Sequence, residues 1–331
     1  MIYELNVVPL SSLMAPIISF IVTYHNEPSV LLQECLESIL ALRLEKDEGE
    51  IIVVDDGSEH FGLQDSGIKF TPIADRESGT SEGRTVFYVR QAQAGLSVAR
   101  NTGLSFSQGK YIQFVDADDC LIPSDYETVL RQVRKGKADV VMFGMRASAQ
   151  LPKDLEERKP QPTSEDSEES RLKGRLGESQ LLHHNLRAAA WGYAFKRDVL
   201  DDLRFCPGLL HEDELFTPQL FLRAKSLVDL NVKAYFYRQH DGTITHSKKP
   251  AQVKKRLDDI LFIIKELRSL GDNRLERRIR QLTVDYLQKT WTQTHSLREL
   301  HSRVSELRKE GFLPLPLRCY SLRYLVASLI F

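Results

Sequence analysis

The chain has 331 residues, of which 42% are hydrophobic and 27% are charged, as is ordinary for a globular protein. At about 150 residues per domain, this length predicts one large domain with an appendage. The formal net charge of -1 gives no long-range attraction for nucleic acid, which excludes binding driven by charge alone. The sequence has no run of about 18 apolar residues, so no isolated membrane-spanning helix is expected.

The cysteines Cys35, Cys120, Cys206 and Cys319 lie far apart, without a CxxC pair. This spacing predicts neither a zinc site nor a disulfide framework, and free thiols in a reducing cytosol fit it best. Residues 1–16 are expected to be an N-terminal extension. Their loosely apolar stretch has no Lys or Arg before it, so a signal peptide is not expected.

The first part of the chain alternates apolar strands with a helix. Residues 17–23 (IISFIVT) and 50–58 (EIIVVDDGS) are apolar runs of strand length, and the second ends in two aspartates and a glycine. Between them, apolar residues recur at helical spacing over 32–40, and Ser29 is placed to cap this helix. Two buried strands joined by a helix are typical of parallel βαβ units, so we expect an α/β fold.

The same alternation continues along the chain. In chain order, we expect a polar loop over 59–84, a strand over 85–90, a helix that opens within 91–101 and continues to Ser107, a helix over 126–135 and a strand over 139–145.

The most informative stretch, 110–123 (KYIQFVDADDCLIP), is an apolar strand that leads directly into three carboxylates. Ligands of α/β sheets bind in the crevice beyond the carboxyl ends of the strands, where Asp116, Asp118 and Asp119 are expected. Alternate residues of an extended chain share a face, so Asp116 and Asp118 can address one ligand together. A divalent ion bound to a diphosphate would relieve their mutual repulsion. The alternative is an acidic turn, with Asp119 or Ser124 capping the next helix.

The composition changes after this part of the chain. Residues 150–180 are crowded with Glu, Lys, Ser and Pro, which predicts a mobile polar insertion. A carboxylate-bearing turn and a helix are expected within 209–225 (LLHEDELFTPQLFLRAK), followed by a strand or strand pair over 228–237. From Ala251 onward, apolar residues recur in helical stripes, which predicts a helical appendage.

The last stretch, 312–331 (FLPLPLRCYSLRYLVASLIF), is the most apolar of the chain. Its helical part is too short to span a bilayer, but residues 317–331 combine apolar side chains with Arg318 and Arg323. This composition suits a helix that lies in a membrane interface. The alternative, which the sequence favours equally, is that the stretch packs against the preceding helices.

The motifs SFIVTYHNE, VVDDGS, GLSVARNTGLSFSQGKYIQFVDADD and HEDELF, in this order, resemble family 2 glycosyltransferases of the GT-A fold. The resemblance covers about residues 17–247. Residues 237–245 (YRQHDGTIT) are similar to a segment of the bacterial enzymes that build capsular polysaccharides and exopolysaccharides. The resemblance therefore implies a GT-A domain over 17–247 and leaves 248–331 as a separate helical region.

The resemblance also implies an activity. A hexosyltransferase of this kind would move a sugar, with inversion, from a nucleotide donor such as a UDP-sugar to a hydroxyl of a growing surface glycan or lipid-linked glycan. It would use Mn²⁺ or Mg²⁺. It would work in the cytoplasm, with a possible peripheral contact at the inner membrane face.

For the donor, the resemblance implies roles for the residues after the first two strands. Asp55 or Asp56 would accept hydrogen bonds from uracil or ribose, beside Thr23, Tyr24 and Glu27. The alternative is that the second aspartate and the glycine after it only make a turn.

The resemblance also assigns Arg100 and the DxD motif. Arg100 would reach the base or the diphosphate, a role that suits a permanent cation with several donors, and the alternative is a surface salt bridge. Asp118 would bind the metal directly, with Asp116 on the ribose or on a metal-bound water and Asp119 as a second partner. The metal would neutralise charge on the departing UDP.

Glu212 and Asp213 stand where the family carries its ED pair, whose aspartate removes the acceptor proton. We therefore expect Asp213 to be the catalytic base, with Glu212 beside it. The alternative is that Asp213 only caps a helix. His211, His240 and His246 are weaker candidates for contacts with the metal or the diphosphate.

Two other functions are compatible with the sequence. A nucleotidyltransferase of similar sheet architecture would be expected to carry a glycine-rich phosphate loop near its start, and residues 24–28 contain no glycine. A catalytically silent protein that only binds nucleotide sugars would not need both Asp118 and Asp213.

Overall fold

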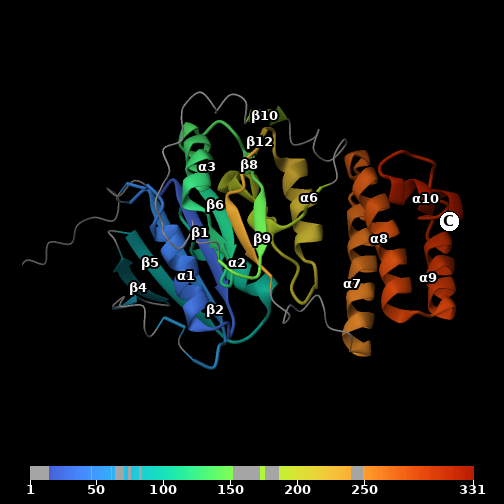
Figure 1. The fold of residues 1–331 in the computed structure, drawn as a ribbon, viewed down its shortest axis with the longest axis horizontal. Coiled ribbons are helices and arrows are strands. Elements are labelled where there is room, and N and C mark those ends of the chain that lie inside the picture. Colours follow the sequence, from blue (N-terminus) through green and yellow to red (C-terminus); the bar gives the residue numbers. More distant parts are fainter. Residues whose placement is uncertain are drawn as a thin grey trace, which may run out of the picture.

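The computed structural model describes residues 15–45, 47–60, 62–63, 71–73, 76–81, 84–151, 172–175, 186–239 and 249–331. Figure 1 shows an α/β part and, at the other end of the molecule, a group of helices that ends the chain. The strands are β1 (Ile18–Tyr24), β2 (Gly49–Asp56), β3 (Thr71–Ile73), β4 (Arg76–Ser81), β5 (Arg84–Gln91), β6 (Tyr111–Asp116), β7 (Cys120–Leu121), β8 (Val140–Met142), β9 (Met145–Ser148), β10 (Leu172–Arg175), β11 (Tyr193–Lys196), β12 (Leu227–Leu230) and β13 (Tyr235–Arg238). The α-helices are α1 (Ser29–Leu40), α2 (Leu96–Phe106), α3 (Pro123–Lys135), α6 (Asp213–Arg223), α7 (Pro250–Ser269), α8 (Glu276–Thr294), α9 (Leu297–Lys309) and α10 (Leu322–Ile330).

The main sheet joins the described strands in the order β10-β12-β8-β11-β6-β1-β2-β5-β4-β3. Its central strands β6, β1, β2 and β5 run parallel, so their carboxyl ends meet at one edge. In this register Thr23 lies beside Asp116, and Tyr24 lies beside Asp55. A second sheet, β7-β13-β9, brings β13 next to the residues that follow Asp116.

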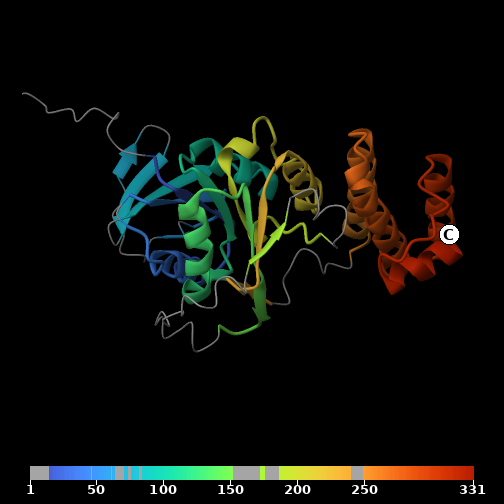
Figure 2. The same cartoon turned by 90° about the horizontal axis from the view of Figure 1, so that it is seen from above.

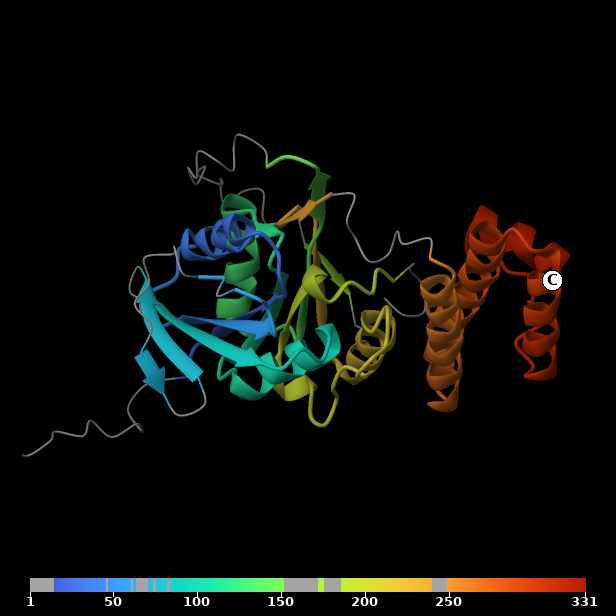
Figure 3. The same cartoon turned by 90° about the horizontal axis from the view of Figure 1, so that it is seen from below.

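Helices cover both faces of the main sheet, because alternate residues of a buried strand point to opposite sides. Phe20 and Val22 of β1 belong to the core beneath α1 and α3, and Ile21 belongs to the core beneath α2 and α6. Figures 2 and 3 show α1 and α3 on one side of the sheet and α2 on the other. The packing of α2 is so close that a Cβ at Gly103 would lie 2.2 Å from Cγ2 of Ile21.

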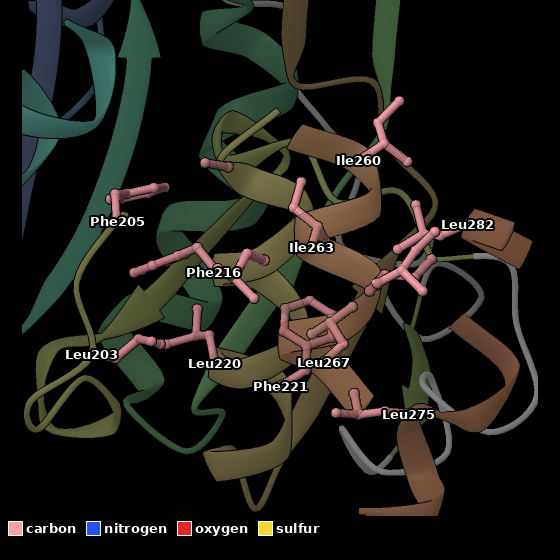
Figure 4. Packing of buried hydrophobic residues seen from close by; sticks show 14 of the residues in the cluster. Leu203, Phe205, Phe216, Leu220, Phe221, Ile260, Ile263, Leu267, Leu275 and Leu282 are labelled. Carbon is pink, nitrogen blue, oxygen red and sulfur yellow. The ribbon is translucent and has the colours of Figure 1, made fainter. Parts of the chain in front are cut away.

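The helices after residue 249 pack directly on α6. The apolar stripe of α7, which includes Ile260 and Ile263, is buried in one continuous core with Phe216 and Leu220 of α6 (Figure 4). Along the described part of the chain, no helix is both long enough and apolar enough to cross a bilayer.

Most of the expected elements are confirmed. The strands expected over 17–23, 50–58 and 85–90 correspond to β1, β2 and β5, and the helix expected over 126–135 is α3, which begins three residues earlier. The helical stripes expected after Ala251 are α7 and α8, and their apolar residues are buried.

Several local expectations are wrong. The stretch 59–84 contains β4, which pairs antiparallel with β5 and, through β3, extends the sheet. Residue 91 still belongs to β5, so the helix begins at Leu96. Ser29 does not cap α1, because the N-cap is Pro28 and no side chain bonds there.

Two stretches that were each expected to form one strand or a strand pair contribute to both sheets. The strand expected over 139–145 ends at Met142, and the chain enters the second sheet at Met145. The stretch 228–237 forms β12 in the main sheet and β13 in the second. Within the expected insertion, residues 172–175 form the edge strand β10. Most of that insertion and of the N-terminal extension lies outside the described residues.

Candidate active site

The candidate site lies where β1, β2 and β6 end, with the turn before α6 beside it. Each of these strands is buried almost throughout, and each carries polar side chains at its carboxyl end. Thr23, Tyr24, Asp55 and Asp116 are neighbours by strand register alone. The pairing of the strands therefore brings these residues together, as the sequence predicted.

The carboxylate of Asp55 is fully buried and bonded inside the protein. Its Oδ1 accepts from the backbone N–H of Ser58 at 2.8 Å, and its Oδ2 accepts from the hydroxyl of Tyr88 at 2.5 Å. Arg90 lies 3.6 Å from the same oxygen. Burial and this carboxylate raise the pKa of Tyr88 above its ordinary value. Asp55 thus ties β2 to β5, and its contact with a nucleoside stays a prediction.

The carboxylate of Asp56 holds the loop that precedes α2. Its oxygens accept from the backbone N–H groups of Ala94 at 2.8 Å and Gly95 at 2.7 Å. Gly57 follows with a φ of 73°, and a Cβ there would lie 2.6 Å from the backbone nitrogen of Gln93. The turn expected as the alternative is therefore present, and a contact of Asp56 with a nucleoside stays a prediction.

Glu27 lies on the acidic side of the site. Its carboxylate accepts from the backbone N–H of His25 at 2.6 Å. Burial raises the pKa of Glu27, and the negative charge of Asp118 acts in the same direction. His25, which the sequence did not single out, joins three segments: its Nδ1 lies 2.8 Å from the carbonyl oxygen of Asp56 and its Nε2 lies 3.0 Å from Gln93.

Arg100 is the central cation of the site. Its guanidinium donates to Asp116 at 3.0 Å and to Glu212 at 2.5 Å, and its side chain is only 3% exposed. The rings of Phe114 and Phe205 lie within 5.7 Å and 5.3 Å of it. Burial lowers the pKa of Arg100, but the surrounding carboxylates outweigh this and raise it overall. The alternative of a surface salt bridge is wrong, because the ion pair is buried.

Asp119 does not cap the next helix, so the alternative of a simple capping turn is wrong. The N-cap of α3 is Ile122, without a side-chain bond. Asp119 is buried, and its Oδ1 accepts from the backbone N–H of Arg238 at 2.7 Å. Arg238 also donates to the carbonyl oxygen of Asp118 at 2.9 Å and pairs with Glu34. The second sheet thus holds the acidic turn in place.

An aromatic stack, which the sequence did not predict, stands beside Asp116. Trp191 stacks on Tyr235 with ring centroids 4.4 Å apart, and Tyr237 lies 5.9 Å away on a similar plane. The backbone N–H of Asp116 donates to the hydroxyl of Tyr235 at 3.1 Å. The stack therefore fixes the end of β6.

Asp213 is the first residue of α6 and is half-buried. Burial raises its pKa, the carboxylates of Glu212 and Glu214 add to this, and Arg100 opposes it. The N-cap of α6 is Glu212 and no side chain bonds there, so capping by Asp213 is not observed. A carboxyl with a raised pKa is suited to accept a proton near neutral pH.

The other two parts of the HED turn have different surroundings. Glu212 is buried, and its carboxylate is bonded to Arg100. Burial, Lys289 and Arg256 lower the pKa of His211 to about 4, and these two cations belong to α8 and α7. His240 and His246 lie outside the described residues.

The acidic turn carries Asp116, Asp118 and Asp119 at and after the end of β6. Burial raises the pKa of Asp119 to about 9, and the charges of Asp116 and Asp118 act in the same direction. In the described ranges, no group of three or more His, Cys, Asp or Glu side chains gathers to hold a metal. The residues present fit an ion that completes its coordination with diphosphate and water, as Mg²⁺ commonly does.

This fold and the carboxylates at its strand ends define a protein of the GT-A class. The described fold matches the crystal structure of S. aureus TarS 1-349 in complex with UDP-GlcNAc, with a TM-score of 0.59 and 18% sequence identity. The match covers 83% of this chain and 72% of that one.

Residues 19–204 match the family model for glycosyl transferase family 2, and the chain belongs to this family. The glycosyltransferase GlyA from Streptococcus pneumoniae is 28% identical over 237 residues, which cover 69% of this chain and 31% of GlyA. The uncharacterized glycosyltransferase EpsJ from Bacillus subtilis is 29% identical over 251 residues, which cover 72% of this chain and 66% of EpsJ. The chain thus spans less than two thirds of either relative.

Proposed function

We propose that the protein is an inverting, metal-dependent glycosyltransferase that moves a sugar from a UDP-sugar to a hydroxyl group of a surface glycan or lipid-linked glycan. The observation that carries this proposal is the buried ion-pair network in which Arg100 joins Asp116, at the end of β6, to Glu212, beside Asp213. Family membership and the TarS-like fold support a nucleotide-sugar donor.

The nucleoside would bind over the ends of β1 and β2. Thr23, Tyr24 and Glu27 border this region, and the bonds of Asp55 and Asp56 keep its floor rigid. A carboxylate offers about four lone-pair positions. Asp56 keeps slight exposure and could accept a further bond from uracil or ribose, whereas a contact of the fully buried Asp55 would require a movement of its neighbours.

The diphosphate and its cation would bind at the acidic turn. Asp118 is the direct ligand in this proposal, and Asp116, which Arg100 and Tyr235 orient, would hold the ribose or a water. When bound, Mn²⁺ or Mg²⁺ would neutralise the charge that develops on the departing UDP. Arg100 is committed to two carboxylates, so it orders the site rather than reaching the diphosphate.

Asp213 would act as the base. The acceptor hydroxyl gives its proton to the Asp213 carboxylate, its oxygen forms the new bond to C1 of the sugar, and the bond from C1 to the UDP oxygen breaks with inversion. Glu212 would position Asp213 by anchoring the turn to Arg100 and would not touch the substrate.

The surface-glycan acceptor rests on the similarity of residues 237–245 to enzymes of exopolysaccharide assembly. Incubation with a panel of nucleotide sugars, with and without Mn²⁺, tests the whole proposal. We expect metal-dependent release of UDP from at least one UDP-sugar. Binding of nucleotide sugars without any turnover would favour the silent binding protein instead.

An anionic membrane surface is the partner proposed for residues 317–331. The outer face of α10 carries Leu322, Val326 and Leu329 at positions i, i+4 and i+7, and these side chains are 79%, 48% and 73% exposed. Residues 317–331 contain two arginines and no acidic residue. Arg323 pairs with Asp285 of α8, so Arg318 carries the charge that would complement anionic lipid. All four cysteines are free, which suits the cytoplasmic side of that membrane.

A further inference from the structure

The turn that carries Asp213 has an unusual backbone. Gly208 has a φ of 74° and His211 a φ of 60°. A residue other than glycine loses free energy in this left-handed region of φ. It keeps such a conformation only where contacts with the surrounding structure stabilise it. Turn 208–214 therefore needs partners outside its own sequence.

The first partner is Asp259, on α7. Its Oδ2 accepts from the backbone N–H of Leu210 at 2.9 Å. Lys255, one turn earlier on the same helix, bonds to Asp259 at 2.7 Å and to the carbonyl oxygen of Gly208 at 2.8 Å. Two backbone groups of the turn are thus bonded to one face of α7.

The second partner is Arg278, on α8. Its guanidinium pairs with Glu214, the residue after Asp213, and donates to the carbonyl oxygen of Leu186 at 2.9 Å. The Arg278 side chain is 9% exposed, so this ion pair is largely shielded from solvent. Because Glu214 is one of the carboxylates that raise the pKa of Asp213, the pair also sets the charge around the base.

The helices that offer these groups are themselves fixed. Ile263 and Leu267 of α7 lie toward Phe216 and Leu220 of α6 in the shared core, as the close-up in Figure 4 shows. Side chains on such a rigid platform can define the position of a neighbouring turn to a fraction of an ångström.

We propose that Asp259 and Arg278 are positioning residues for the transfer reaction and hold turn 208–214 so that Asp213 faces Arg100 and the acceptor. This inference rests on the proposed role of Asp213 as the base. It gives the C-terminal helices a part in catalysis, although neither residue touches the substrate.

The test compares Asp259→Ala with Asp259→Asn and with Asp258→Ala. Asn retains an oxygen that accepts from Leu210. Asp258 is the neighbour on the same helix, but it pairs with Lys254 and Arg303, away from the turn. For each full-length variant we would measure amide hydrogen exchange across 208–214, the affinity for UDP with Mn²⁺, and kcat and KM with the UDP-sugar that the wild type turns over.

We expect Asp259→Ala to speed exchange in the turn and to lower kcat by about tenfold or more, since small misplacements of catalytic groups cost up to about 10²-fold. UDP affinity and KM should not change, and Asp259→Asn should restore most of kcat. Asp258→Ala should behave as the wild type.

Unchanged exchange in the turn, or an equal loss of kcat in Asp258→Ala, would overturn the positioning role. A wild-type protein without turnover on any nucleotide sugar would overturn the proposed function instead. In that case the exchange data would still decide whether Asp259 holds the turn.

Discussion

Arg100 joins carboxylates from two distant parts of the chain. The sequence identified it as a functional cation, but its partner Glu212 is 112 residues away and no local pattern connects them. A buried guanidinium between two carboxylates satisfies charges that would be costly to leave unpaired. The sequence predicted candidate residues for the site, and only the fold shows which of them bond to one another.

The bonding partners of the two aspartates at the end of β2 could not be predicted from the sequence either. The sequence predicted that Asp55 and Asp56 follow a buried strand, and the structure places both at the carboxyl end of β2. Ligand binding at this edge stays a prediction. The bonds of these aspartates to Tyr88 and to the loop before α2 depend on β5 and α2 packing alongside, which no spacing in the sequence reveals.

Asp118→Asn tests the metal site. The substitution keeps the shape of the side chain and removes one negative charge, so UDP binding should lose most of its dependence on Mn²⁺ while the melting temperature is retained. Calorimetric titration of UDP with and without Mn²⁺ measures the effect. Asp198→Asn, at an exposed position, is the matched control. Metal-dependent UDP affinity equal to that of the wild type in a folded Asp118→Asn protein would contradict the assignment.

Asp213→Asn tests the base. The variant should bind UDP as the wild type does and lose transfer by roughly 10²-fold or more, the typical contribution of positioned proton transfer. Because burial and neighbouring carboxylates raise the pKa of Asp213, the wild-type rate should fall as the pH falls through that pKa. The variant should lack this fall. A variant with a lower melting temperature but the kcat of the wild type would show that Asp213 only stabilises helix α6.

At the scale of elements, buried strands and long amphipathic helices were predictable, because their apolar residues repeat with a clear period. The missed strands lie toward the two ends of the main sheet. β4 (RESGTS) and β10 (LKGR) are short and polar and contain glycine, so their sequences resemble loops, and only pairing with β5 and β12 makes them strands.

For the C-terminal helix α10, the sequence favoured packing on the preceding helices and contact with a membrane equally. Its inner face packs on α8, with Tyr324 only 1% exposed and Ala327 against the same core. Its outer face is apolar and uncovered in the described structure. The expectation of packing is therefore confirmed for one face, and membrane contact is proposed for the other.

Replacement of Leu322, Val326 and Leu329 by serine tests that contact. The triple variant should lose co-sedimentation with anionic vesicles and keep the wild-type melting temperature, because these side chains are exposed. Leu297→Ser, on α9, removes a leucine that is 72% exposed and should leave vesicle binding unchanged. Absence of vesicle binding by the intact protein contradicts the membrane role. Dimer dissociation in the variant would point to a second copy of the chain as the partner of this face.

At the scale of the whole molecule, one apolar core crosses the boundary that the sequence predicts at residues 247 and 248. Phe216, Leu220 and Phe221 of α6 and the buried stripe of α7 are members of the same cluster. The predicted boundary marks where the family resemblance ends, and burial across it couples the stability of the two parts.

We therefore predict that the chain unfolds in a single cooperative transition and that a cavity in the helical region destabilises the transferase sheet as well. Ile263 is 1% exposed beneath α6, and its neighbour Phe262 is 41% exposed on the opposite side of α7. Ile263→Ala should lower the free energy of unfolding by about 2–5 kcal/mol, and Phe262→Ala by well under half of that. Every protein in this test also carries Trp291→Phe on α8, so that the fluorescence reports Trp191 alone. Urea unfolding, followed by the fluorescence of Trp191 near the active site and by helical circular dichroism, measures both. If the parts are independent, Ile263→Ala will shift the circular dichroism transition and leave the Trp191 transition in place; if the core is shared energetically, both transitions will move together.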